Sequence, residues 1–530
     1  MFLANNGLVT IGLQQRPVDE TQQRQSEKII KSPRGRHTAH RSAAAARLDR
    51  IEIDGFLIVQ RSFRNPTAAS LQYRSSAGQC RMRVLSDRPE AASRSMSDTP
   101  SAVRRPPGQS DQVHLGIDPE TLATLTQVRE EFGDIVAMRR RNGRLAYFIN
   151  DPAEVRWILV RRHARYVKGP GFERVKMLLG NGLIVSDGDV WRRSRTMIQP
   201  AFSRQNVHRL MTVMVECCDR RAAAWAAAAA KGETLNITEE TCDFALELIL
   251  ISTFGDDYDS RIVTHGENPF AFLSRDSTRD LGVVMKVRHL RRLFLSIIED
   301  RRAGKASRQF DFLTLYLAAM DKQGRKFSDD ELLDELMTLI VAGFETSANT
   351  LNWVWYLIAK HPGVETRLID EAQRVVPNVS AITAQNLGEM TYTQQVLEEV
   401  LRLYPPVWLF TRRSHADDDL EDFDVPAGTD IYLSPFVLHR TDHYWPVPDR
   451  FDPERFVPTD QPKKERPFFP FSLGPRRCLG EFFSFLEMKV HLGLLLPRFR
   501  MSLVKETKPE LELAINLRVA DDIHVRPAIR

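Results

Sequence analysis

Residues Phe471–Gly480 read Phe-Ser-Leu-Gly-Pro-Arg-Arg-Cys-Leu-Gly, and this stretch decides the interpretation of the whole chain. Gly474 and Pro475 predict a tight turn, and Cys478 stands directly before an apolar pattern of helical period that runs to Val490. A cysteine at a helix N-terminus faces unpaired backbone N–H groups and the positive end of the helix dipole, which favour the thiolate. A lone thiolate on a short loop suits a metal with one protein sulfur ligand and points to haem iron. A buried, inert cysteine is the alternative that Cys478 alone would favour.

The spacing F-x-x-G-x-R-x-C-x-G resembles the haem-binding loop of the cytochrome P450 family. Four further motifs follow the family's order along the chain: W-x-x-x-R at Trp191–Arg195, A-G-x-E-T at Ala342–Thr346, E-x-x-R at Glu399–Arg402 and P-E-R-F at Pro453–Phe456. The resemblance covers residues 110–530. It implies a mainly α fold with small β-sheets, in which a single large helical domain surrounds a buried haem b.

The composition is that of a globular protein. The chain has 530 residues, of which 42% are hydrophobic and 27% charged, and its mean hydropathy is −0.32. These values exclude a collagen-like chain, a wholly disordered chain and a polytopic membrane protein. No apolar run approaches the roughly 18–20 residues that span a bilayer, so we expect no transmembrane anchor. The five cysteines form no C-x-x-C pair, which favours reduced thiols and a cytoplasmic location. We also expect a monomer.

Residues 1–95 differ from the rest of the chain. They hold twice as many basic as acidic residues, whereas the remainder is slightly acidic, so the net charge of +5 does not indicate a nucleic-acid-binding body. The segment has no sustained periodicity, and we expect a disordered basic extension. A start codon assigned too early, with Met96 as the better start, is one explanation, and a basic arm for nucleic acid or an anionic membrane is another. Residues 96–530 are the expected catalytic domain.

Hydrophobic periodicity predicts the main elements of that domain. Helices are expected over Pro119–Phe132, Val207–Lys231, Ile237–Phe254 and Leu281–Arg302, and strands over Leu145–Ile149 and Thr429–Leu433. The longest predicted helix begins at a capping box formed by Ser328 and Glu331 and ends at Lys360, before a proline.

The middle of this long helix is unusual. Gly343, Glu345 and Thr346 interrupt an otherwise apolar stretch. A buried helix that carries a glycine, an acid and an alcohol is locally inconsistent, and such places are often functional. Glu345 and Thr346 resemble the family's acid–alcohol pair, which delivers protons during oxygen activation, and Ala342 and Gly343 would leave room for the gas. The alternative for Thr346 is a hydroxyl that merely donates to a carbonyl of the preceding turn.

The resemblance also assigns the haem contacts. Cys478 would be the iron ligand, in a loop shaped by Phe471, Gly474 and Gly480. A guanidinium fork suits a carboxylate, and the residues expected against the two haem propionates are Trp191, Arg195, Arg412 and Arg476. Arg413 is an alternative to Arg412, because a slip of one residue exchanges them. Arg192 and Arg193 are expected to be solvated.

A buried charge network is implied beside the cysteine loop. Glu399 and Arg402 are three residues apart and share one helix face, and the resemblance adds Arg455 to them. Without the other motifs, a surface pair would be the better interpretation of Glu399 and Arg402.

The sequence signal for residues that contact the substrate is less specific. The apolar residues Val407, Trp408 and Phe410 predict a small hydrophobic substrate, although such a run is more often simply core. Family members place two long helices and a loop between the Phe254 region and the helix that begins near Gly282, where they form a lid. Residues 256–281 are too few for both helices, so we expect a short lid.

The resemblance implies a haem-thiolate monooxygenase, which inserts one atom of O2 into a hydrophobic substrate. Electrons would come from NAD(P)H through a ferredoxin- or flavodoxin-type partner, steered by basic residues near the cysteine: Arg192, Arg193, Arg477, Lys463 and Lys464. An enzyme of isomerase or dehydratase type that does not activate oxygen is one alternative, and Glu345 and Thr346 argue against it. An inactive haem-binding homologue or sensor, favoured by the short lid, is the other.

Overall fold

The computed structural model describes residues 48–53, 56–61, 71–75, 78–82, 103–263, 281–305, 307, 310–379, 382–420, 422–459 and 466–530. The chain divides into two units, Met1–Asp98 and Thr99–Arg530. In the first unit, four short strands form an antiparallel sheet in sequence order: β1 (Leu48–Ile53), β2 (Phe56–Arg61), β3 (Leu71–Ser75) and β4 (Gly78–Met82). This differs from the expectation of a segment without regular structure, because strands of five or six residues are too short to give a sustained period.

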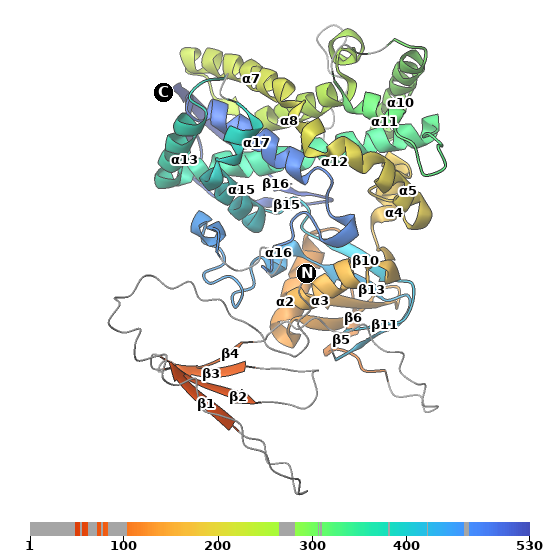
Figure 1. The fold of residues 1–530 in the computed structure, drawn as a ribbon, viewed down its shortest axis with the longest axis vertical. Coiled ribbons are helices and arrows are strands. Elements are labelled where there is room, and N and C mark those ends of the chain that lie inside the picture. The colour runs from red at the N-terminus through yellow and green to blue at the C-terminus, as the bar shows by residue number, and fades with distance from the viewer. Residues whose placement is uncertain are drawn as a thin grey trace, which may run out of the picture. The chain divides into compact units, whose positions relative to one another are not determined.

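The second unit is mainly helical, as the sequence predicted (Figure 1). Its helices are α2 (Pro119–Phe132), α3 (Pro152–Arg156), α4 (Phe172–Leu179), α5 (Gly188–Ile198), α6 (Arg204–His208), α7 (Met211–Lys231), α8 (Ile237–Phe254), α10 (Leu281–Arg302), α11 (Phe312–Ala318), α12 (Asp329–Lys360), α13 (Pro362–Val375), α14 (Ala384–Gly388), α15 (Thr391–Leu403), α16 (Pro435–Leu438) and α17 (Glu481–Leu495). The predicted helix Val207–Lys231 is interrupted by a turn at Arg209 and Leu210 and so becomes α6 and α7.

The sheets of the second unit are small. The strands are β5 (Gly108–Val113), β6 (Ile135–Arg140), β7 (Leu145–Ile149), β8 (Tyr166–Lys168), β9 (Leu235–Asn236), β10 (Phe410–Ser414), β11 (Asp418–Asp419), β12 (Asp424–Val425), β13 (Asp430–Leu433), β14 (Phe499–Leu503), β15 (Leu511–Leu513), β16 (Leu517–Val519) and β17 (His524–Ile529). A mixed sheet has the order β5-β6-β7-β13-β10-β8, a second has the order β14-β17-β9, and β11–β12 and β15–β16 are two-stranded.

Helix α12 runs through the middle of the second unit and packs along α8 (Figure 1). Its predicted start is confirmed, because Ser328 and Glu331 form a reciprocal capping box, and it ends at Lys360. Gly343 lies against α8, since a Cβ built there would be 3.0 Å from the Ile249 side chain. The missing side chain therefore lets two long buried helices approach closely.

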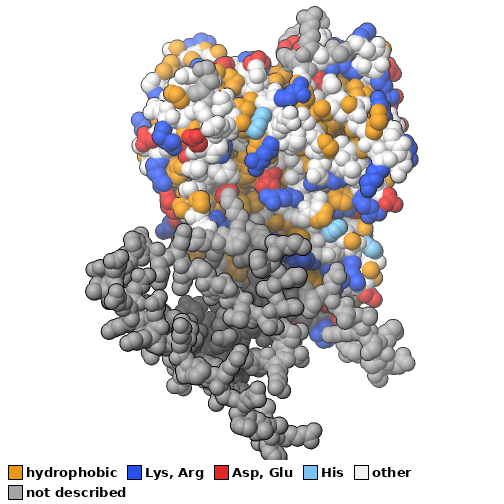
Figure 2. Space-filling model, viewed as in Figure 1, with side chains coloured by type: hydrophobic (Ala, Val, Ile, Leu, Met, Phe, Trp, Pro, Cys, Tyr) orange, Lys and Arg blue, Asp and Glu red, His pale blue; other side chains and the backbone are white. Residues whose placement is uncertain are grey.

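Charged and apolar side chains are mixed on the face of the second unit that Figure 2 shows. Figure 2 shows basic, acidic and apolar side chains interspersed over the visible face of the second unit, without one large basic patch. Within the described residues, no helix combines the length and the apolar character needed to cross a membrane.

A fully buried ion pair lies within α15, and its arginine also binds the segment that follows α16. Arg402 Nε and Nη2 donate to the two carboxylate oxygens of Glu399 at 2.6 and 2.8 Å, and both side chains have no exposed surface. Arg402 also donates to the carbonyls of His439 and Pro448, at 2.8 and 2.7 Å. Arg455 Nε lies 3.5 Å from Glu399 Oε1. The three charged residues named in the sequence analysis therefore lie together.

Replacing Arg402 by Met should destabilise the second unit strongly. Glu399 would keep a buried charge without its main partner, and the free energy of unfolding should fall by about 3–5 kcal/mol, measured by urea denaturation. The control is Arg367→Met, which breaks an ion pair to Glu454 in which both side chains are about half exposed, and it should change the stability by less than about 1 kcal/mol. Equal effects of the two substitutions would contradict the structural importance of the buried pair.

A chain that begins at Met96 should fold as the full chain does. The hydrophobic core found in the described residues is built between Val113 and Val525, so the second unit has its own apolar interior. We expect equal melting temperatures for the shortened and the full chain in a calorimetric scan. A loss of several degrees on shortening would mean that residues 1–95 stabilise the second unit.

Candidate functional site

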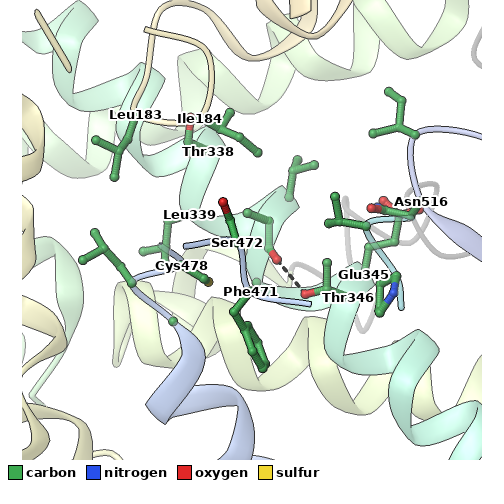
Figure 3. Close-up of a pocket in the computed structure, with 18 of the residues that line it drawn as sticks. Leu183, Ile184, Thr338, Leu339, Glu345, Thr346, Phe471, Ser472, Cys478 and Asn516 are labelled. Atoms are coloured by element: carbon green, nitrogen blue, oxygen red, sulfur yellow. Dashed lines mark hydrogen bonds between the residues drawn. The ribbon is translucent and has the colours of Figure 1, made fainter. Parts of the chain in front are cut away.

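A cavity of about 440 Å³ lies between α12 and the loop that precedes α17. Figure 3 shows Thr346 and Glu345 on the side of α12, and Phe471, Ser472 and Cys478 on the side of the loop. The lining is mostly apolar and includes Leu183, Ile184, Ile249, Val407, Leu409 and Phe410. Such a cavity is suited to a large hydrophobic ligand.

The cysteine loop is fixed by its backbone. Gly474 has φ +67°, and a Cβ at this position would lie 2.2 Å from the carbonyl oxygen of Leu159, so no other residue fits without a shift. The Cys478 N–H donates to the carbonyl of Phe471 at 3.0 Å and closes the loop. Arg195 Nη1 donates to the carbonyl of Arg477 at 2.8 Å. These contacts hold the Cys478 sulfur toward the cavity (Figure 3).

The electrostatics of Cys478 differ from the sequence expectation. Burial raises the pKa of the thiol, while the N–H groups of Gly480 and Glu481 and the charge of Arg195 lower it. The helix N-terminus therefore acts in the expected direction, but desolvation is the larger effect and the net shift is upward. A bound metal cation deprotonates a coordinating thiol, so a metal-containing group would supply what this site lacks.

One wall of the cavity carries an excess of buried positive charge. Burial lowers the pKa of Arg412 to about 10, with a further contribution from the charge of Arg476, and lowers that of Lys168 well below its usual value. Asp187 is an acidic partner of this group: it accepts from Arg476 and from the Lys168 backbone N–H. Three cations around one carboxylate fit a ligand that brings further carboxylates, as haem does.

Most of the expected haem contacts line this cavity. Arg476 stacks over the Trp191 ring at 4.3 Å, and Trp191, Arg195, Arg412, Phe471, Arg476, Cys478 and Gly480 all contribute to the lining. Arg413 does not share the position of Arg412, because its Nε donates to Asp430 at 2.6 Å. Consecutive residues of a strand point to opposite faces, so only one of the two arginines faces the cavity.

The α12 wall brings together Ala342, Gly343, Glu345 and Thr346, as expected. The Thr346 hydroxyl donates to the Ala342 carbonyl at 3.0 Å (Figure 3), which is the back-bond considered as the alternative role. The Glu345 side chain is buried, and its Oε1 lies 4.0 Å from Arg518 Nη1. An acid and an alcohol thus lie on the wall that faces Cys478.

Two expectations are wrong in detail. Val407 and Phe410 line the cavity, but Trp408 is fully buried in the core and donates to the Ala514 carbonyl at 2.9 Å. Arg193 is not solvated, because it donates to Asp321, Glu331 and the Lys326 carbonyl and thereby ties α5 to the start of α12.

Other expectations lie partly outside the described residues. These are Lys463 and Lys464 of the basic patch and residues 264–280 of the lid segment. Arg192 pairs with Asp189 and is largely exposed, and Arg477 pairs with Glu481 and is about half exposed.

Several lining residues carried no motif. Lys168 ends a short strand, and Asn516 and Arg518 lie in and after the turn between β15 and β16, where the sequence offers no regular spacing. Glu335 and Thr338 could have been found, since they precede Glu345 on the same helix face, at intervals of three and seven residues.

The sequence of the second unit matches one protein family along most of its length. Residues 112–518 match the family model described as Cytochrome P450. The chain is 31% identical over 394 residues to cyclooctatin synthase of Streptomyces melanosporofaciens, with 71% of this chain and 84% of the relative covered. It is 28% identical over 386 residues to pentalenene oxygenase of Streptomyces avermitilis, with 70% and 84% covered.

A solved structure shares the fold. Retinoic-acid-bound cyanobacterial CYP120A1 superposes with a TM-score of 0.69 at 25% identity, covering 81% of this chain and all of that one. The match of the family model, the sequence relatives and the shared fold lead to the same assignment, and this chain belongs to the cytochrome P450 family.

Proposed function

We propose that the protein is a haem-thiolate monooxygenase that inserts one oxygen atom from O2 into a hydrophobic organic substrate. The observation that carries the proposal is the pairing of two walls across one apolar cavity: Cys478 and a set of buried cations on one side, and Glu345 with Thr346 on the other. Family membership supports haem as the cofactor. The relatives named oxygenase or monooxygenase support the reaction class.

The residues present fit the haem. Cys478 would hold the iron, and Lys168, Arg412 and Arg476 would neutralise the haem carboxylates, with Trp191 stacked beneath Arg476. When bound, the haem supplies the activation of O2 and the transfer of one oxygen atom to the substrate. The apolar lining excludes water from the reacting groups, and Glu345 and Thr346 hold and move the protons that this chemistry consumes.

The substrate should be largely hydrocarbon. The lining near Val407 and Phe410 is apolar, and two similar proteins are named for pentalenene and for cyclooctat-9-en-7-ol. We extend that class to this chain, as an unsaturated cyclic hydrocarbon or its alcohol. The alternative of an enzyme that does not activate oxygen would leave the acid and the alcohol of α12 without a catalytic role.

Electrons would come from NAD(P)H through a separate ferredoxin- or flavodoxin-type partner. Two exposed basic side chains lie near Cys478. Arg477 precedes it in the cysteine loop, and Arg192 is on the same helix as Arg195, which contacts that loop. An acidic partner would be steered toward such residues, with an association rate that falls as salt screens the charges.

The thiolate ligand is tested by the ferrous–CO spectrum. The wild-type protein should show the strongly red-shifted CO band that an anionic sulfur ligand produces. Cys478→Ser should abolish this band even when haem is retained, whereas Cys242→Ala, which removes a thiol on α8, should keep it. Persistence of the band in Cys478→Ser at full haem content would contradict the ligand assignment.

Proton delivery is tested by Thr346→Ala. General acid–base groups contribute about 10²–10⁴-fold, so product formed per NAD(P)H should fall at least about ten-fold while hydrogen peroxide release rises. Thr346→Ser should restore most of the coupling. The control is Thr124→Ala, since the Thr124 hydroxyl donates the same kind of back-bond, to the Glu120 carbonyl, at an exposed place on α2. Unchanged coupling in Thr346→Ala would leave the back-bond as the role of this threonine.

A further inference from the structure

One face of α12 is polar although the helix is buried. Glu335, Thr338, Glu345, Asn349 and Asn352 recur at helical spacing and share this face over five turns. The first three of these residues line the cavity. Asn349 and Asn352 lie beyond it on the same face. The polar surface of the cavity therefore continues into the interior of the protein.

Asn349 and Asn352 are buried, and the amide nitrogen of each side chain lacks a hydrogen-bond partner among the described residues. Their exposed fractions are 6% and 1%, and the Nδ2 atom of each is buried without a hydrogen-bond partner in the described part of the chain. An unsatisfied buried amide is destabilising, and native proteins commonly satisfy such groups with ordered water. Two of them at i and i+3 on one helix face point to a small hydrated space rather than to two isolated defects.

The polar face reaches the surface at the N-terminus of α8. Asn352 Oδ1 accepts a hydrogen bond from Thr238 Oγ1 at 3.2 Å, and Thr238 Oγ1 accepts from the Ile523 N–H at 3.0 Å. Next to Thr238, the exposed side chains of Asn236 and Asp522 are bonded at 2.6 Å. At the inner end, Arg518 lies 4.0 Å from Glu345. Polar groups thus extend from the cavity acid to an exposed carboxylate.

We propose that Asn349 and Asn352 hold a file of water molecules that joins Glu345 to the surface at Thr238 and Asp522, and that protons enter the cavity by this file. The proposal rests on the proposed monooxygenase function, which consumes protons in a cavity that its apolar substrate keeps dry. A proton from bulk water passes along the file, each step breaking one O–H bond and forming the next. The last step forms the O–H bond of the Glu345 carboxyl group. The amides position the waters and do not themselves transfer protons.

The first test needs no turnover. A high-resolution crystal structure should show ordered water within hydrogen-bond distance of Asn349 Nδ2 and Asn352 Nδ2. In Asn349→Leu this water should be lost and the melting temperature should fall, because the remaining waters lose a partner. A dry site would instead give no water density in the wild-type protein and a rise in melting temperature in Asn349→Leu. Either of these dry-site results overturns the proposal, whatever the reaction.

The second test measures proton supply in the haem-loaded enzyme. Asn349→Leu should lower product formed per NAD(P)H several-fold, raise peroxide release and increase the solvent deuterium isotope effect. Asn349→Ser, which keeps a polar group and room for water, should recover most of the coupling. The control is Ser252→Ala, which removes another unsatisfied buried hydroxyl near the far end of α8 and should leave coupling unchanged.

The outcomes separate this inference from the proposed function. Wild-type coupling in Asn349→Leu overturns the proton route, even if water is present at the amides. If the wild-type enzyme consumes no O2 with any hydrophobic substrate, the proposed function fails, and the crystallographic and melting results still decide whether the file of water exists.

Discussion

The bidentate ion pair between Glu399 and Arg402 is the interaction on which the position of the cysteine loop depends. Arg402 binds the carbonyl of His439, and the His439 ring nitrogen Nε2 accepts the N–H of Phe469 at 3.0 Å. Phe469 lies two residues before Phe471, whose carbonyl closes the loop around Cys478. The buried pair therefore fixes, through two backbone contacts, where the cysteine can lie. Because both charged groups are fully buried, substitution of either residue by an uncharged one leaves the other as an uncompensated buried charge.

Each of the two walls of the cavity contains groups whose burial is unfavourable, and these groups differ in kind. The wall of Lys168, Arg412 and Arg476 keeps cations in a desolvated place where their pKa values are lowered. The α12 wall keeps polar side chains in a buried helix. Both arrangements are costly in the protein alone, and a ligand that brings negative charge, or water, would reduce this cost. The site is thus organised for occupants before they bind, which is what preorganisation requires.

Much of the fold and of the site could be predicted from the sequence, because short-range rules govern those parts. The capping box set the start of α12, and motif spacing identified Cys478, Glu399 and Arg402. The direction in which individual side chains point was harder to predict. A shift of one residue along a strand or loop exchanges the side chains that face the core with those that face away from it. For this reason the sequence could not decide between Arg412 and Arg413, or predict that Trp408 points into the core. Lys168 had no motif, and the upward pKa shift of Cys478 arises from burial by segments distant in sequence.

The turn between β15 and β16 is held by its backbone rather than by the side chains that it shows to the cavity. Trp408 binds the carbonyl of Ala514, and the Leu517 N–H binds the carbonyl of Pro406 at 2.8 Å. The side chains of Ile515 and Asn516, which line the cavity, take no part in these two hydrogen bonds. For protein engineering, this means that substitutions at Ile515 and Asn516 can change the shape of the cavity while both hydrogen bonds that anchor the turn are kept.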